Sequence, residues 1–183
     1  MINSSYGYTD YDTQASDARN KLAFRDGSLP MTWQHCSLTA EFLGEFFAVQ
    51  ARLRKLNENE ARYNIAYLAN ELLENVVKFR TRGTIELETS IEDSTFKLMV
   101  SNWIAPETAG RFQSTLQELL ARDAGELLIE RIEANAAEVS SSGSGLGLLT
   151  LMNDYGARLG WTFKQDAPGD PIHLHTFAAL ALS

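Results

Sequence analysis

The sequence predicts an α+β fold, in which helices pack on one face of a mixed sheet within a single domain. Its 183 residues suit one domain with a sizeable core. Helical and strand-like patterns follow one another in runs and do not alternate strictly, which favours α+β over a doubly wound arrangement. Two pairs of short apolar segments are each joined by a turn signal, and no internal repeat or linker divides the chain.

The first thirty residues are polar and rich in turn-forming side chains. They predict a loose N-terminal arm at residues 1–30, with one short strand near 21–25, and the domain proper at 31–183. Residues 1–12 lack the basic start and apolar core of a secretory signal. No stretch is apolar over the roughly 18 residues that a membrane span needs. The single cysteine, Cys36, allows no intramolecular disulfide, so a cytoplasmic protein without a membrane partner is expected.

The charge balance is acidic, with a formal net charge of −8. A protein that binds the phosphate backbone of nucleic acid usually gathers Lys and Arg on one face, and no such run is present. No nucleic-acid partner is therefore expected. A bound nucleotide needs only a few local donors, and a basic protein partner also remains compatible with this charge.

Two long helices are expected after the arm. Ser37 or Thr39 could cap the first, which would end near Leu56. Helical spacing predicts that its buried stripe consists of Leu38, Phe42, Phe46, Val49 and Leu53. The second is expected over residues 59–79. Its predicted buried stripe consists of Ile65, Leu68, Leu72, Val76 and Phe79.

The rest of the chain reads as a hairpin, a helical segment, a glycine loop with a helix, and two closing strands. The helical segment, 106–136, is expected as two helices broken near 123–125. The remaining elements are expected at 84–91 and 96–101 for the hairpin, 139–147 for the loop, 148–155 for its helix, and 159–165 and 172–182 for the closing strands.

The second helix carries a polar stripe beside its apolar one. Glu71, Asn75 and Lys78 are spaced i, i+4 and i+7, so that a carboxylate and a carboxamide face one small volume. Such oxygen ligands suit Mg²⁺ and its waters, and a glutamate can also act as a general base. The alternative interpretation is a solvated helix face with an ion pair between Glu74 and Lys78.

The glycine loop combines three glycines at alternate positions with serine hydroxyls. Glycines let the backbone approach a ligand, and the N-terminus of the next helix offers free N–H groups to a phosphate. A Rossmann or Walker spacing is absent, and an ordinary surface loop is the alternative. The candidate phosphate contacts are Ser142, Gly143, Ser144, Gly145, Leu146 and Gly147.

In this chain order, the two elements resemble the N box and the second glycine box of GHKL ATPase and kinase domains. The resemblance implies a two-layer α/β sandwich of the Bergerat type. Between the two boxes the family usually has D-x-G-x-G, whose Asp accepts the adenine amino group. The matching segment, residues 100–104, has neither the Asp nor the glycines. Asn102 could accept that hydrogen bond through its amide oxygen, and Trp103 is expected near the base.

Residues 67–161 are most similar to small bacterial SiaB-type and anti-sigma-factor Ser/Thr protein kinases of partner-switching systems. The resemblance implies ATP and Mg²⁺ as cofactors, with Glu71 as the base, Asn75 as the Mg²⁺ ligand and Lys78 as a phosphate contact. It implies a small regulatory substrate protein of the anti-sigma-antagonist type, and it leaves open a homodimer.

Two alternatives remain at this point. The Asn75-x-x-Lys78 pattern also resembles histidine kinases, but His35, His173 and His175 lack the setting of a phosphoacceptor, and structural roles are expected for them. A degenerate GHKL domain that holds a regulatory partner without catalysis is the second alternative. The presence of Glu71 and Asn75 favours the enzyme, whereas the missing D-x-G-x-G favours the binding module.

Overall fold

The computed structural model describes residues 2–9, 19–25, 31–137 and 145–183. Six strands and five helices follow one another in these segments. They are β1 (Ile2–Gly7), β2 (Asn20–Phe24), α1 (Trp33–Leu53), α2 (Glu58–Phe79), β3 (Ile85–Glu92), β4 (Thr95–Ile104), α3 (Pro106–Ala121), α4 (Ala124–Ala137), α5 (Leu146–Asn153), β5 (Arg158–Gln165) and β6 (Ile172–Ala181).

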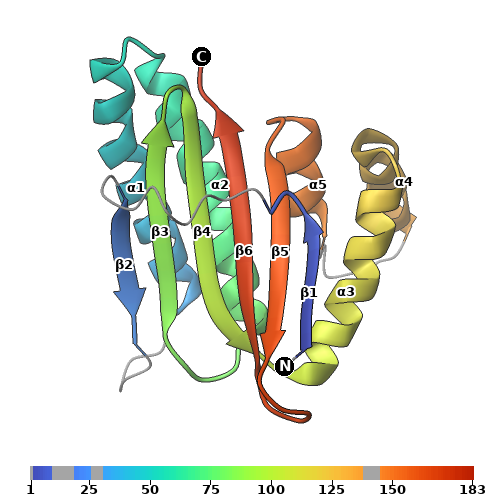
Figure 1. The fold of residues 1–183 in the computed structure, drawn as a ribbon. Helices are drawn as coiled ribbons and strands as arrows, with labels where there is room; N and C mark the ends of the chain where they lie inside the picture. Colours follow the sequence, from blue (N-terminus) through green and yellow to red (C-terminus); the bar gives the residue numbers. More distant parts are fainter. Residues whose placement is uncertain (1, 10–18, 26–30, 138–144) are drawn as a thin grey trace.

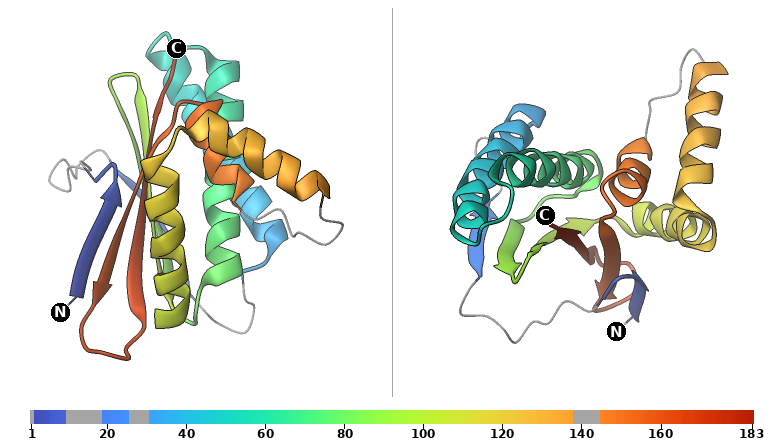
Figure 2. Two further views of the ribbon diagram at one scale, coloured as in Figure 1. Left: turned by 90° about the vertical axis from the view of Figure 1, so that its right-hand side faces the viewer. Right: turned by 90° about the horizontal axis from the view of Figure 1, so that it is seen from above.

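The strands form one sheet in the order β1-β5-β6-β4-β3-β2. The helices cover one face of it, with α1 and α2 over one end and α3, α4 and α5 over the other (Figures 1 and 2). This arrangement confirms the predicted α+β sandwich with helices on one face. The sheet differs from the prediction in one respect. A mixed sheet was expected, but every pair of neighbouring described strands is antiparallel.

The expected loose arm is wrong for the part of residues 1–30 that the structure describes. The predicted short strand is present as β2, but β1 was missed, and the two strands form opposite edges of the sheet. Tyr6 on β1 packs edge-on against Phe163 at 5.7 Å. A Cβ at Gly160 would collide with the backbone of Tyr8, so this glycine lets the edge strand approach. β1 has only two large side chains, which is too few to signal a strand by pattern.

The stripe predicted to be buried on α1 faces solvent instead. Leu38, Phe42, Phe46, Val49 and Leu53 are all exposed. The helix buries a different face, which consists of Cys36, Ala40, Leu43, Gly44, Phe47, Ala48 and Ala51. Its small residues allow α2 to approach closely: a Cβ on Gly44 would lie 2.6 Å from the carbonyl oxygen of Arg62. Close helix packing, rather than side-chain hydrophobicity, therefore decides which face of α1 is buried.

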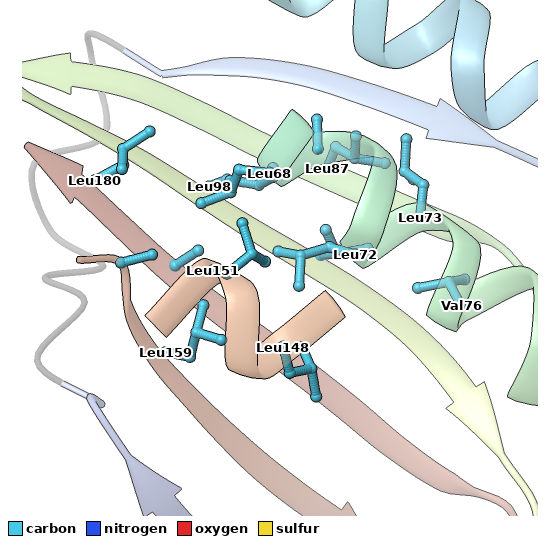
Figure 3. Packing of buried hydrophobic residues seen from close by; sticks show 14 of the residues in the cluster. Leu68, Leu72, Leu73, Val76, Leu87, Leu98, Leu148, Leu151, Leu159 and Leu180 are labelled. Atoms are coloured by element: carbon cyan, nitrogen blue, oxygen red, sulfur yellow. The ribbon is translucent and has the colours of Figure 1, made fainter. Parts of the chain in front are cut away.

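The predicted stripe of α2 is largely confirmed. Ile65, Leu68, Leu72 and Val76 are buried, whereas Phe79 at the C-terminal end is exposed. In Figure 3 Leu68, Leu72 and Val76 meet leucines from the sheet and from α5. The docking of α5 against α2 and the sheet places the N-terminus of α5 beside α2, where the candidate site lies.

The predicted break between the two helices of the insert is confirmed between α3 and α4. The Asp123 carboxylate accepts a hydrogen bond from the Glu126 backbone N–H at 3.0 Å, which caps the start of α4. α3 packs beside β1 through a Gln113–Ser4 hydrogen bond of 3.0 Å. None of the helices within the described segments is both long enough and apolar enough to cross a membrane.

Candidate functional site

The polar stripe of α2 and the end of the glycine loop meet in the folded protein. A Cβ at Gly147 would overlap the carboxylate of Glu71 as it lies here, so Glu71 would have to move if this residue were larger than glycine. Gly145 is the N-cap of α5 and has φ 110°, a left-handed conformation that favours glycine. Of the predicted phosphate contacts, Ser142, Gly143 and Ser144 lie outside the described residues, and Leu146 is the first residue of α5.

A cavity of about 110 Å³ lies between the two elements. The α2 side chains and the α5 N-terminus contribute most of its wall. Its lining consists of Trp33, Glu71, Glu74, Asn75, Lys78, Gly145, Gly147 and Leu148. The structure thus places Glu71, Asn75 and Lys78 around one cavity with two of the predicted glycines, as their spacing indicated.

The surroundings of Glu71 favour the protonated form of its carboxyl group. Its pKa is raised, first by burial and then by the negative charge of Glu74 one turn away. A hydrogen bond from the Tyr67 hydroxyl partly opposes this by stabilising the carboxylate. Tyr67 is held in place by stacking on Tyr155 at 4.8 Å. The carboxylate is therefore held on one side by Tyr67 and lies close to Gly147 on the other.

Asn75 is oriented by its own helix. Its side-chain nitrogen donates to the backbone carbonyl of Glu71 at 2.9 Å, which leaves the amide oxygen available as a ligand. The described residues contain no cluster of three His, Cys, Asp or Glu side chains that could hold a metal by themselves. Mg²⁺ suits this donor set nevertheless, because it commonly takes one or two protein oxygens and completes its shell with water and phosphate.

Two residues at the site were not identified from the sequence. Trp33, the first residue of α1, lines the cavity. Arg131 of α4 reaches the glycine loop, since its Nη1 lies 2.7 Å from the position that a Cβ on Gly145 would take. The same guanidinium lies 3.4 Å from the Glu118 carboxylate. Neither residue belongs to a local motif, so nothing in the sequence distinguished either of them from other surface residues.

Asn102 lies on β4, on the face that the helices cover, together with Val100 and Ile104. Its amide nitrogen lies 3.4 Å from the Trp103 carbonyl oxygen. Its amide oxygen is buried and has no hydrogen-bond partner among the described residues. A buried acceptor without a partner costs about 1–3 kcal/mol. Asn102 is thus a candidate acceptor for a ligand, although it does not line the 110 Å³ cavity.

The expected place of Trp103 is wrong. Successive strand residues point to opposite faces, so Trp103 lies on the face of the sheet that the helices leave uncovered. There it stacks on His173 at 4.5 Å, and His173 in turn hydrogen-bonds His175 at 3.1 Å. His35 hydrogen-bonds Thr32 at the start of α1. None of the three histidines lines the 110 Å³ cavity.

Comparison with solved structures shows a protein of similar fold. No protein-family model matches this chain, and no curated protein matches it either. A chain in the crystal structure of the SiaB–SiaC complex from Pseudomonas aeruginosa superimposes with a TM-score of 0.61. The match covers 87% of this chain and 89% of that chain at 16% sequence identity. At this identity the similarity establishes a shared fold.

Proposed function

We propose that this protein is an ATP- and Mg²⁺-dependent Ser/Thr protein kinase of a partner-switching system. The observation that carries the proposal is the direct apposition of the Glu71 carboxylate to Gly147 at the N-terminus of α5. Transfer of a phosphoryl group to a hydroxyl depends mainly on positioning and charge neutralisation, to which a helix N-terminus and a carboxylate that orients the hydroxyl can both contribute. The shared fold with a chain of the SiaB–SiaC complex supports the same class.

In this proposal, the N–H groups at the start of α5 and the Lys78 ammonium bind the phosphates of ATP. The Asn75 amide oxygen would hold Mg²⁺, and the ion would supply positive charge to offset the phosphates beside Glu71 and Glu74. Glu71 accepts the proton of the substrate hydroxyl while the hydroxyl oxygen attacks the γ-phosphorus of ATP. The bond from that phosphorus to the bridging oxygen breaks, and ADP leaves with the electron pair. Partial burial raises the pKa of Glu71, which favours its taking the proton.

The size of the cavity limits what the described residues can hold. Its volume of about 110 Å³ is well below the ~300–1,000 Å³ of pockets for drug-sized ligands. The cavity therefore suits phosphate oxygens and an ion rather than a whole nucleotide. In this proposal, binding of the whole nucleotide requires further space from the glycine loop and from the region that would hold adenine. Asn102 is the candidate acceptor for the adenine amino group.

A binding module that holds a regulatory protein without catalysis is the second candidate. The observation that favours it is the sequence at residues 100–104, where Asn102 replaces an aspartate and no glycine is present. The similar chain comes from a structure of two proteins in complex, SiaB and SiaC. In both candidates we propose that the partner is a small regulatory protein, of the anti-sigma-antagonist type if the kinase assignment holds.

Titration calorimetry with ATP, with and without Mg²⁺, tests the nucleotide site. Radiolabelled phosphate transfer to candidate partners encoded near this gene then separates the two candidates. The kinase proposal expects Mg²⁺-dependent binding and transfer that needs Glu71. A protein that binds such a partner, yet neither binds nor turns over ATP at millimolar concentration, would be the binding module.

A further inference from the structure

A second cavity lies on the other side of the sheet, on the face that the helices leave uncovered (Figure 2). Its volume is about 240 Å³, more than twice the 110 Å³ of the cavity beside Glu71. One row of paired strand residues crosses its floor from β2 to β6, in the order Lys21, Glu88, Met99 and Phe177. The cavity thus runs across several strands, and the sheet separates it from the candidate kinase site.

The walls of this cavity are rich in positive charge, although the whole chain has a net charge of −8. Three of the described residues that line it are cationic, namely Arg19, Lys21 and Lys164. Glu88 is the only acid among the described lining residues. The side-chain nitrogens of Arg19 and Lys21 lie 3.5 Å and 2.7 Å from its carboxylate. Cations therefore outnumber acids in the cavity, and this excess suits a ligand with negative charge.

At its β5 end the cavity presents a cation, a hydroxyl group and an imidazole. Thr162 pairs with His175 across β5 and β6, and Lys164 follows Thr162 on the same face of β5. The pKa of His175 is lowered to about 4, first by burial and then by the nearby His173 and Lys164 side chains, which disfavour a further positive charge. Its imidazole is therefore neutral at pH 7. Lys164 supplies the positive charge here, whereas Thr162 and His175 can supply hydrogen bonds.

The middle of the cavity has an apolar and aromatic floor. Met99 and Phe177 form a small buried cluster of their own, apart from the main core. The rings of His175 and Phe177 lie nearly parallel, at 25° and with their centroids 6.2 Å apart. A flat apolar group can stack on such rings, as aromatic pairs do. Two strand spacings, about 10 Å, separate β4 from β5, so one ring with one acidic substituent can reach from Met99 to Lys164.

We propose that this cavity binds a small aromatic acid, whose carboxylate or phosphate group contacts Lys164 and whose ring packs on Phe177 and Met99. The excess of cations in an acidic chain and the aromatic floor beside them carry the proposal. The volume of about 240 Å³ is below the ~300–1,000 Å³ of pockets for drug-sized ligands, which favours a compact ligand. Because the sheet lies between the two cavities, this site does not depend on the proposed kinase activity.

NMR spectra of the imidazole nitrogens in the full chain test the proposal, with benzoate as the probe. The signals of His173 and His175 should shift in a saturable way with a Kd on the order of 1 mM, while those of His35 on α1 should not shift. Acetate carries the charge alone and benzyl alcohol the ring alone, so each should bind at least about 10-fold more weakly. Tighter binding of phenyl phosphate than of benzoate would identify phosphate as the preferred group, and the reverse order would identify a carboxylate.

Two cations on the same face of β5 provide matched variants. Lys164→Gln should weaken benzoate binding by about 5-fold. Arg158→Gln removes a cation that lies outside the cavity, over the ring of Tyr8, and should leave the affinity unchanged. Phe177→Leu keeps an apolar side chain but removes the ring, and should weaken binding by about 3-fold. Circular dichroism checks that each variant is folded. Unshifted His175 signals, benzoate binding no tighter than that of acetate or benzyl alcohol, or equal losses in Lys164→Gln and Arg158→Gln would overturn the proposal.

Discussion

Replacing Glu71 by glutamine removes its charge while keeping its shape, and so tests whether its carboxylate is a base. The amide oxygen of glutamine can still accept the hydrogen bond from Tyr67, and its size fits the space beside Gly147. General-base catalysis typically contributes ~10²–10⁴-fold, or about 3–5 kcal/mol of activation free energy. Glu71→Gln should therefore reduce the phosphate-transfer rate by that factor while ATP affinity changes little.

The same substitution has a second expected effect, on stability. Because the pKa of Glu71 is raised in the folded state, its ionised form is less favourable there than in the unfolded chain. The stability that protonated Glu71 contributes is fully present below the pKa that it has in the unfolded chain. That stability is lost as the pH rises through the higher pKa that Glu71 has in the folded protein. At pH 7 the neutral glutamine avoids that loss, so the Tm of Glu71→Gln should equal or exceed that of the parent. The difference should shrink on acidification.

Glu74→Gln is the matched control for this experiment. Glu74 lines the same cavity and accepts a hydrogen bond from Asn70 at 2.8 Å, but it does not contact Gly147 in the way that Glu71 does. Its negative charge is one cause of the raised Glu71 pKa, so its removal should shift the rise of activity with pH to lower pH. A transfer rate for Glu71→Gln equal to that of the parent, or equal losses in both variants, would refute the assignment of the base.

Four further outcomes are expected. Asn75→Ala should abolish the Mg²⁺ dependence of ATP binding in calorimetry; retained dependence would place the ion elsewhere. Gly145→Val should weaken ATP binding, because a branched side chain is strained at φ 110° and meets Arg131, whereas unchanged affinity would identify an ordinary surface loop. Arg131→Gln should weaken ATP binding more than AMP binding if its guanidinium meets the terminal phosphates. Phe47→Ala should lower the free energy of unfolding in urea by about 3–5 kcal/mol, since Phe47 is fully buried against Phe96 at 4.9 Å; a loss under 1 kcal/mol would contradict this.

The sequence by itself determined the elements whose signals are local. The helical spacing of Glu71, Asn75 and Lys78 placed them on one face of α2. The glycine pattern predicted a helix after the loop, and α5 begins at Leu146, two residues before the predicted start. The break before α4 followed from turn-forming residues near Asp123. These predictions held because hydrogen bonds and side-chain directions within a helix depend on residues only a few positions apart.

Only the tertiary structure decided which of two plausible faces a helix or strand buries. On α1 the buried face combines Leu43 and Phe47 with small residues around Gly44, against which α2 packs closely, whereas Phe42 and Phe46 are exposed. The approach of Arg131 to Gly145 and the opposite placements of Asn102 and Trp103 likewise came from contacts between distant segments. A periodic pattern reports that a face is apolar. Whether that face meets the core or remains available to another molecule depends on the shape of the neighbouring element, which no local pattern contains.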